Sequence, residues 1–137
     1  MRIAAIASSI ADKCMAEKKE AIHTASILCK TDLISGVVGE FPELQGIMGG
    51  YYAINDGYSK EIVTAISEHY KPAFSGDSAP VSKIGAVISL ADKIDNLTSF
   101  FGIGLMPTGT EDPFALRRQA IGTISILTDK RLPITIN

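Results

Sequence analysis

The segment formed by residues 81–101 is apolar on nearly every side, and it constrains the fold more than any other feature of the chain. A helix that is hydrophobic all round is buried in a protein core or spans a membrane. The longest uncharged run in the segment, residues 84–91, has about half of the ~18 residues that a bilayer span requires. The segment therefore predicts a central helix that other helices cover, and we expect no membrane partner.

The composition fits one folded domain. Of the 137 residues, 46% are apolar and 20% are charged, which excludes a disordered chain. The formal charge of −2 excludes a generally basic nucleic-acid arm but leaves room for a local basic patch. Cys14 and Cys29 form no CxxC pair, so a disulfide scaffold and a zinc ribbon are excluded. Two free thiols predict a reducing, cytoplasmic location.

The remaining apolar periodicity is helical. It predicts helices at about residues 2–16, 17–30, 42–52 and 60–70, and from residue 112 to about residue 130. The tail 132–136 is too short to build a sheet. We therefore expect an all-α fold, a single bundle of six to seven helices around the buried central helix.

Cap residues place several helix starts. Asp32 is a plausible N-cap for the turn that follows it, and Pro42 can open the next helix. Gly46, Gly49 and Gly50 interrupt that helix, so close packing or a kink is expected there. Asp112, followed by a proline, is the sharpest helix start in the chain.

Two carboxylates are candidates for chemistry. Asp92 and Asp95 lie three residues apart near the end of the central segment, at neighbouring positions of one helix face. They are either a metal or acid–base site, or a structural pair satisfied by Lys93, an arginine or backbone amides. His23 and His69 are isolated and cannot supply a three-histidine metal set, so each is expected to be a packing or surface histidine.

Arg117 and Arg118 lie one to two turns into the last predicted helix. Adjacent helical residues point about 100° apart, so one arginine can brace the fold while the other faces solvent. Their chemistry allows either phosphate contact or a salt bridge to Asp92, Asp95 or Glu40.

Four segments carry a resemblance to a known family. They are KTDLISGVVGEFPELQGIMGGYYA (30–53), EHYKPAFSGD (68–77), LADKIDNLTSFFGIG (90–104) and PTGTEDPFALRRQAIG (107–122). In this order they resemble an interior part of the β subunit of bacterial heterotetrameric glycyl-tRNA synthetase. The resemblance implies that residues 1–137 are a single helical HD-like domain and a fragment of a longer β subunit.

The resemblance also implies a degenerate metal site. HD-like phosphohydrolases have an H…HD…D ligand pattern, and Cys29 and Lys30 stand at its His-Asp position. Asp92 stands at the last ligand position. A charged lysine does not ligate a metal, so no metal and no catalytic residue is expected here.

The family's activity implies how this domain would act. The enzyme charges tRNA(Gly) with glycine, using ATP and Mg through the separate α subunit, and this domain would need no cofactor. It would be a non-catalytic module that contacts tRNA near the acceptor arm or serves as a scaffold. The expected partners are the α subunit, tRNA(Gly) and the remainder of the β subunit.

The candidate tRNA contacts are Lys30, Lys71, Arg117 and Arg118. The alternative function is a residual metal-dependent HD phosphohydrolase acting on nucleotides. A third possibility is a purely structural spacer, which exposed apolar patches would favour.

Overall fold

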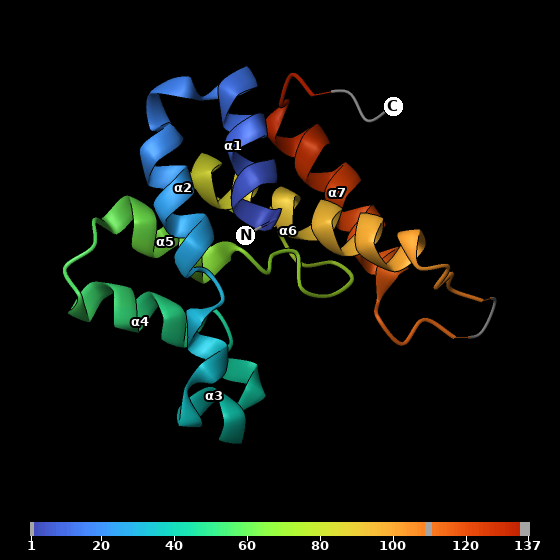
Figure 1. Cartoon of the computed structure of the whole chain (residues 1–137), viewed down its shortest axis with the longest axis horizontal. Helices are drawn as coiled ribbons and strands as arrows, with labels where there is room; N and C mark the ends of the chain where they lie inside the picture. The colour runs from blue at the N-terminus through green and yellow to red at the C-terminus, as the bar shows by residue number, and fades with distance from the viewer. Residues whose placement is uncertain (1, 109–110, 135–137) are drawn as a thin grey trace.

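The computed structural model describes residues 2–108 and 111–134, and within these ranges every regular element is helical (Figure 1). The α-helices are α1 (Arg2–Cys14), α2 (Lys19–Leu28), α3 (Gly36–Glu40), α4 (Ile47–Asn55), α5 (Lys60–Glu68), α6 (Lys83–Gly102) and α7 (Leu116–Lys130). Three short 3-10 helices, η1 (Ala16–Lys18), η2 (Thr31–Ile34) and η3 (Pro42–Leu44), lie between them. The all-α prediction is confirmed; part of the tail 132–136 lies outside the described residues.

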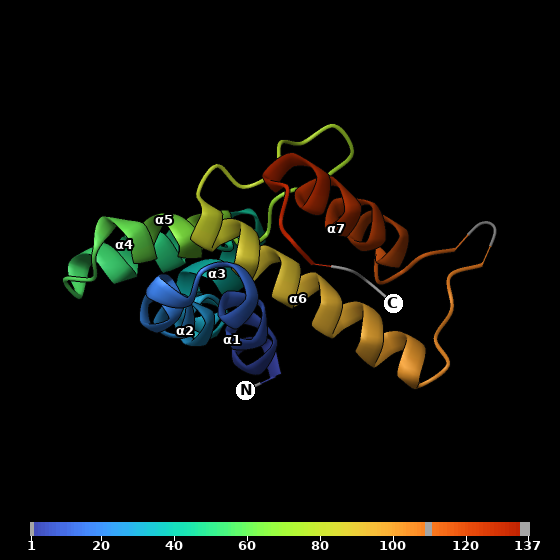
Figure 2. The same ribbon diagram turned by 90° about the horizontal axis from the view of Figure 1, so that it is seen from above.

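Helix α6 is the centre of the bundle, as the sequence predicts. It packs against α1, α2, α5 and α7. Figure 2 shows α1 and α2 on one side of α6 and α7 on the other. Residues 84–93 are buried without interruption, because neighbouring helices cover this part of α6 on all sides. None of the described helices is long and apolar enough to cross a membrane.

The predicted helix at residues 42–52 is wrong in one respect, because two elements replace it. Pro42 opens only η3, and α4 begins at Ile47. Gly46 separates the two with a φ of 80°, a left-handed value that glycine adopts without strain. The predicted helix at 17–30 is similarly divided into η1 and α2.

The prediction that Asp112 caps the last helix is confirmed, but the predicted first residue of that helix is wrong. Ala115 adopts a left-handed conformation, so α7 begins only at Leu116. The Asp112 carboxylate nevertheless accepts hydrogen bonds from the backbone N–H groups of Leu116 (2.7 Å) and Arg117 (2.9 Å). It therefore satisfies donors in the first turn of α7 from outside the helix.

Asp32 does not cap the turn that follows it, which corrects another expectation. Ser35 caps α3, while Asp32 is fully buried in η2 and points to the start of α4. One of its carboxylate oxygens, Oδ2, accepts hydrogen bonds from the N–H groups of Gly46 (2.7 Å) and Gly49 (3.1 Å). A negative charge at a helix N-terminus is favourable, so the first turn of α4 stabilises this buried carboxylate.

Close packing explains the glycines of α4, as predicted. A Cβ atom at Gly49 would lie 2.9 Å from Cγ2 of Ile66 on α5 and 3.3 Å from Oδ2 of Asp32. A Cβ atom at Gly50 would lie closer still to the side chain of Ser67. The absence of side chains thus allows α4 to approach both α5 and the buried carboxylate.

Replacement of Asp32 by alanine is expected to lower the free energy of unfolding by about 1–3 kcal/mol, because it leaves two buried N–H donors without a partner. Urea denaturation measures the change. The control is Asp12→Ala, which removes an exposed ion pair with Lys19 and should cost less than about 1 kcal/mol. Equal losses in the two variants would contradict the capping role of Asp32.

Candidate functional site

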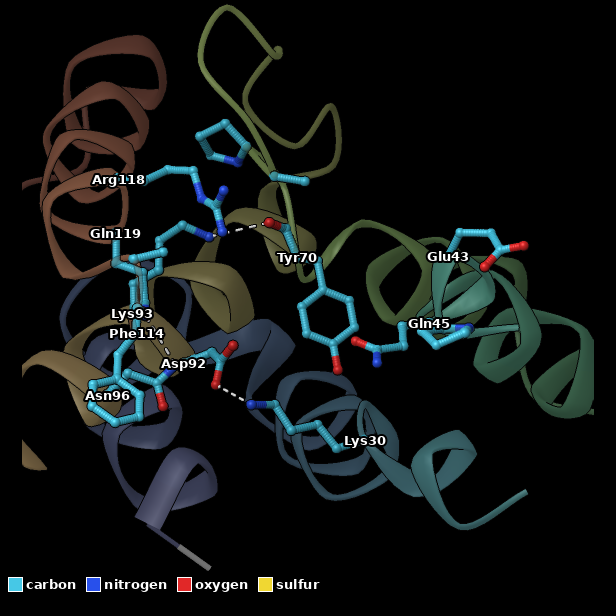
Figure 3. Close-up of a pocket in the computed structure, with 14 residues that line it drawn as sticks. Lys30, Glu43, Gln45, Tyr70, Asp92, Lys93, Asn96, Phe114, Arg118 and Gln119 are labelled. Carbon is cyan, nitrogen blue, oxygen red and sulfur yellow. Dashed lines mark hydrogen bonds and ion pairs between the residues drawn. The ribbon is translucent and has the colours of Figure 1, made fainter. Parts of the chain in front are cut away.

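A pocket of about 410 Å³ lies where the loop after α5 meets η3, α6 and the start of α7 (Figure 3). Several residues singled out from the sequence line it. Its charged and polar lining residues are Lys30, Glu43, Gln45, Tyr70, Asp92, Lys93, Asn96, Arg118 and Gln119. The apolar part of the lining is formed by Pro42, Pro72, Ala73, Phe114 and Ala115.

An ion pair forms one wall of the pocket. The Lys30 Nζ atom lies 2.6 Å from Oδ1 of Asp92, and their side chains are 28% and 6% exposed. A buried carboxylate needs such a partner, and here it comes from the second residue after α2. Asp95 pairs separately with Arg2, whose Nε lies 2.9 Å from its Oδ1. These contacts favour the structural interpretation of the two aspartates, but the lysine partner is Lys30 and not the expected Lys93.

Lys93 is the functional candidate that the sequence did not single out. Its side chain is buried, and its Nζ donates hydrogen bonds to Oγ of Ser89 (2.8 Å) and to the carbonyl oxygens of Lys71 (3.1 Å) and Tyr70 (3.4 Å). The signal that could have found it is a lysine inside the apolar segment of α6.

The surroundings of Lys93 disfavour its positive charge. The pKa of Lys93 is lowered to about 8, mainly by burial; the nearby cations Lys30 and Arg118 contribute to this lowering, while Asp92 acts in the opposite direction. Such a strongly perturbed lysine in a pocket is typical of a binding or catalytic site.

The structure brings only two of the four candidate tRNA contacts together. Lys30 and Arg118 line the same pocket, and Figure 3 shows their side chains approaching it from opposite sides. Lys71 instead directs its ammonium to Oγ of Ser78 (3.5 Å). Arg117 donates a hydrogen bond to the carbonyl oxygen of Thr108 and so braces the loop before α7. Both arginines are exposed, so the expected division is found only in that Arg117 also braces this loop.

The three residues that the resemblance places in a degenerate HD site do not fit a metal ion. Cys29 is fully buried, and burial, with a smaller effect of the Asp92 charge, raises the pKa of its thiol to about 12. Metal ligation needs the thiolate. The Lys30 ammonium already contacts Asp92 where a cation would be held. Among the described residues no group of three or more His, Cys, Asp or Glu side chains could hold a metal ion.

The two histidines are structural, as expected. His23 lies on the exposed side of α2. His69 is fully buried, and its Nδ1 lies 2.6 Å from the carbonyl oxygen of Ile66. Burial lowers the pKa of His69, so the neutral ring that donates from Nδ1 is favoured.

Comparisons with known proteins agree with one another. A family model described as "Glycyl-tRNA synthetase beta subunit" matches residues 1–137. A "Glycine--tRNA ligase beta subunit" from Thermodesulfovibrio yellowstonii is 53% identical over 136 residues, which is 99% of this chain and 20% of that protein. Proteins of the same name from Acidovorax sp. (strain JS42) and Geobacter metallireducens are 54% and 50% identical over 85% and 94% of this chain. The chain spans only 16% to 20% of the length of these relatives.

We expect Cys29 to resist alkylation in the folded chain. With a thiol pKa of about 12, roughly one molecule in 10⁴ carries the reactive thiolate near pH 8, and burial blocks access as well. Iodoacetamide should label Cys29 in the folded chain at least about 100-fold more slowly than in concentrated urea. Peptide mass spectrometry measures the rate of labelling in both conditions. Labelling of Cys29 at the same rate in both conditions would contradict the buried, protonated thiol.

Proposed function

The chain belongs to the glycyl-tRNA synthetase beta subunit family, and from this premise we propose that it is a non-catalytic module of a glycine–tRNA ligase. In this proposal the complete enzyme charges tRNA(Gly) with glycine in the cytoplasm. ATP and Mg act through the α subunit, and the module needs no cofactor of its own. Its partners are tRNA(Gly), the remainder of the β subunit and, through that subunit, the α subunit.

One observation carries the non-catalytic part of the proposal: the 2.6 Å ion pair between Lys30 and Asp92. An ammonium group neutralises the carboxylate as a metal would, but it offers no vacant position for water or substrate. A metal-dependent phosphohydrolase needs such a position to generate its nucleophile. The ion pair therefore supports a binding or scaffold module over a residual phosphohydrolase.

Exposed cations support contact with tRNA. Arg118 and Arg117 are exposed at the start of α7, and Lys71 lies on the adjoining loop. A guanidinium group matches the geometry of a phosphate, and phosphate contacts supply most of the sequence-independent affinity for nucleic acid. Lys30 is the weakest of the four candidates, since its charge is already paired with Asp92.

Exposed apolar side chains support contact with the remainder of the subunit. We call one group of them the α3–α4 apolar surface, formed by Leu33, Ile34, Val37, Phe41, Ile47, Tyr51 and Ile54. The elements that carry them, η2, α3 and α4, lie beside one another (Figure 1). Ile34 is 93% exposed and Tyr51 is 62% exposed. Apolar surfaces of this kind are typical of protein interfaces, and about four fifths of a relative's length lies outside the matched region.

Binding of the chain to tRNA(Gly) across a salt series tests the contact with tRNA. We expect salt-sensitive binding in which Arg118→Ala flattens the log–log slope by roughly one unit, because one phosphate contact is lost. Arg117→Ala should change the slope less, since its guanidinium already braces Thr108. Lys19→Ala on α2 is the control cation. The absence of binding at low salt would refute the tRNA contact and leave a scaffold.

Substitution of Ile34 by serine tests the scaffold. In the isolated chain this exposed residue should change the free energy of unfolding by less than about 0.5 kcal/mol. In a complete β subunit the same change should cost about 1–3 kcal/mol, because burial of an isoleucine at an interface is lost. Thermal unfolding of both proteins measures the difference, with Val81→Ser, outside the α3–α4 apolar surface, as the control. Equal effects in the two proteins would contradict the docking of this surface.

A further inference from the structure

Two of the three cations that line the pocket between α6 and α7 lack a carboxylate partner. Lys30 is paired with Asp92, but within residues 2–108 and 111–134 neither Lys93 nor Arg118 forms an ion pair. The hydrogen bonds of Lys93 all go to uncharged acceptors. Figure 3 shows the ends of both side chains close together at one side of the pocket.

The positive charges of Lys93 and Arg118, unpaired among the described residues, are energetically unfavourable unless an anion binds beside them. A buried ammonium without a carboxylate loses hydration that neutral acceptors replace only in part. The Arg118 and Lys30 charges add repulsion, which is one reason why the pKa of Lys93 is lowered. Asp92 compensates part of this charge, yet its nearest partner is Lys30. An anion beside Lys93 and Arg118 would remove the repulsion.

The donors that remain suit a phosphate group. The contact from Lys93 Nζ to the Tyr70 carbonyl oxygen, at 3.4 Å, is longer than an ordinary N–H···O hydrogen bond. This N–H can therefore turn toward a ligand while Ser89 and the Lys71 carbonyl keep the ammonium in place. The exposed Arg118 guanidinium can bind two phosphate oxygens at once.

The pocket is larger than a bare phosphate ion needs. Its volume of about 410 Å³ lies within the ~300–1,000 Å³ range of small-molecule sites. Two aromatic rings, Tyr70 and Phe114, belong to the lining, and Phe114 is held by stacking on Phe100 at 4.4 Å. The amide of Asn96 donates a hydrogen bond to the Gln119 side chain (2.9 Å), which fixes the wall between α6 and α7.

We propose that this pocket binds a nucleoside monophosphate unit, with its phosphate between Lys93 and Arg118 and its base and sugar against the aromatic and amide wall. The unit is either a free mononucleotide or the 5′-phosphorylated end of an RNA. No bond is made or broken. The proposal does not depend on the proposed function, because a free nucleotide can bind even where tRNA does not.

Calorimetric titration of the chain at constant ionic strength tests the site. The probes are adenosine 5′-monophosphate and adenosine, and a short RNA with a 5′-phosphate and the same RNA with a 5′-hydroxyl. We expect each phosphorylated probe to bind at least about tenfold more tightly than its partner, because charge-assisted hydrogen bonds are lost without the phosphate. A higher affinity for the phosphorylated RNA than for the mononucleotide identifies an RNA end, and the reverse identifies a free nucleotide.

Substitutions assign the binding to this pocket. Arg118→Gln should weaken binding of adenosine 5′-monophosphate by about tenfold or more, since it removes the bidentate donor. Glu43→Gln should strengthen it, because it removes an exposed negative charge from the same lining. Lys83→Gln, a cation on α6 outside the pocket, is the control and should leave the affinity within about twofold. All three sites are exposed, and circular dichroism verifies folding.

Three results would overturn the proposal. They are no binding of either phosphorylated probe, equal affinity for adenosine and its monophosphate, and an unchanged affinity in Arg118→Gln. An equal loss of affinity in Arg118→Gln and Lys83→Gln would also overturn it, since general electrostatic attraction would then explain the binding. Failure of tRNA binding alone leaves these results unaffected, so the two proposals fail separately.

Discussion

The ion pair between Lys30 and Asp92 is the interaction on which the site depends. It joins the second residue after α2 to the middle of the central helix α6, and so fixes one wall of the pocket. Removal of one partner from a buried pair typically costs about 3–5 kcal/mol, because the other charge is left without compensation. Asp92 is the more buried of the two, so the lysine is the partner that the fold requires. The same contact removes Lys30 from the charges available to a ligand.

Several buried charged groups of this bundle are stabilised by different neighbours. The first turn of α4 supplies two N–H donors to Asp32, and Arg2 on α1 pairs with Asp95. Three neutral acceptors surround the ammonium of Lys93. Helix α6 can therefore carry charged residues and still be buried, because three surrounding segments approach it with complementary groups. Buried polar groups need such partners, and here they fix how α1, α2 and the loop after α5 pack on α6.

The features of the fold that depend on a local sequence pattern could be predicted. The all-round apolarity of residues 84–91 identifies the central helix, and the Asp-Pro pair identifies Asp112 as a cap. The sequence could not place the start of α7, because an alanine gives no local signal for the left-handed conformation that Ala115 adopts. Asp32 caps a helix that begins 15 residues later in the chain, which no local rule reveals. The candidate site shows the same limit, since two of the groups that hold the Lys93 ammonium are carbonyl groups on another segment, which the position of Lys93 in an apolar segment does not reveal.

An ammonium and a metal ion neutralise a carboxylate in different ways, and this difference separates binding from catalysis here. A metal at Asp92 would keep exchangeable positions and could activate water. The Lys30 ammonium is covalently part of the chain, has no vacant coordination position and stabilises Asp92 permanently. The pocket retains positive charge, carried by Lys93 and Arg118. Under both of our proposals, such a pocket would hold a phosphorylated ligand without cleaving it.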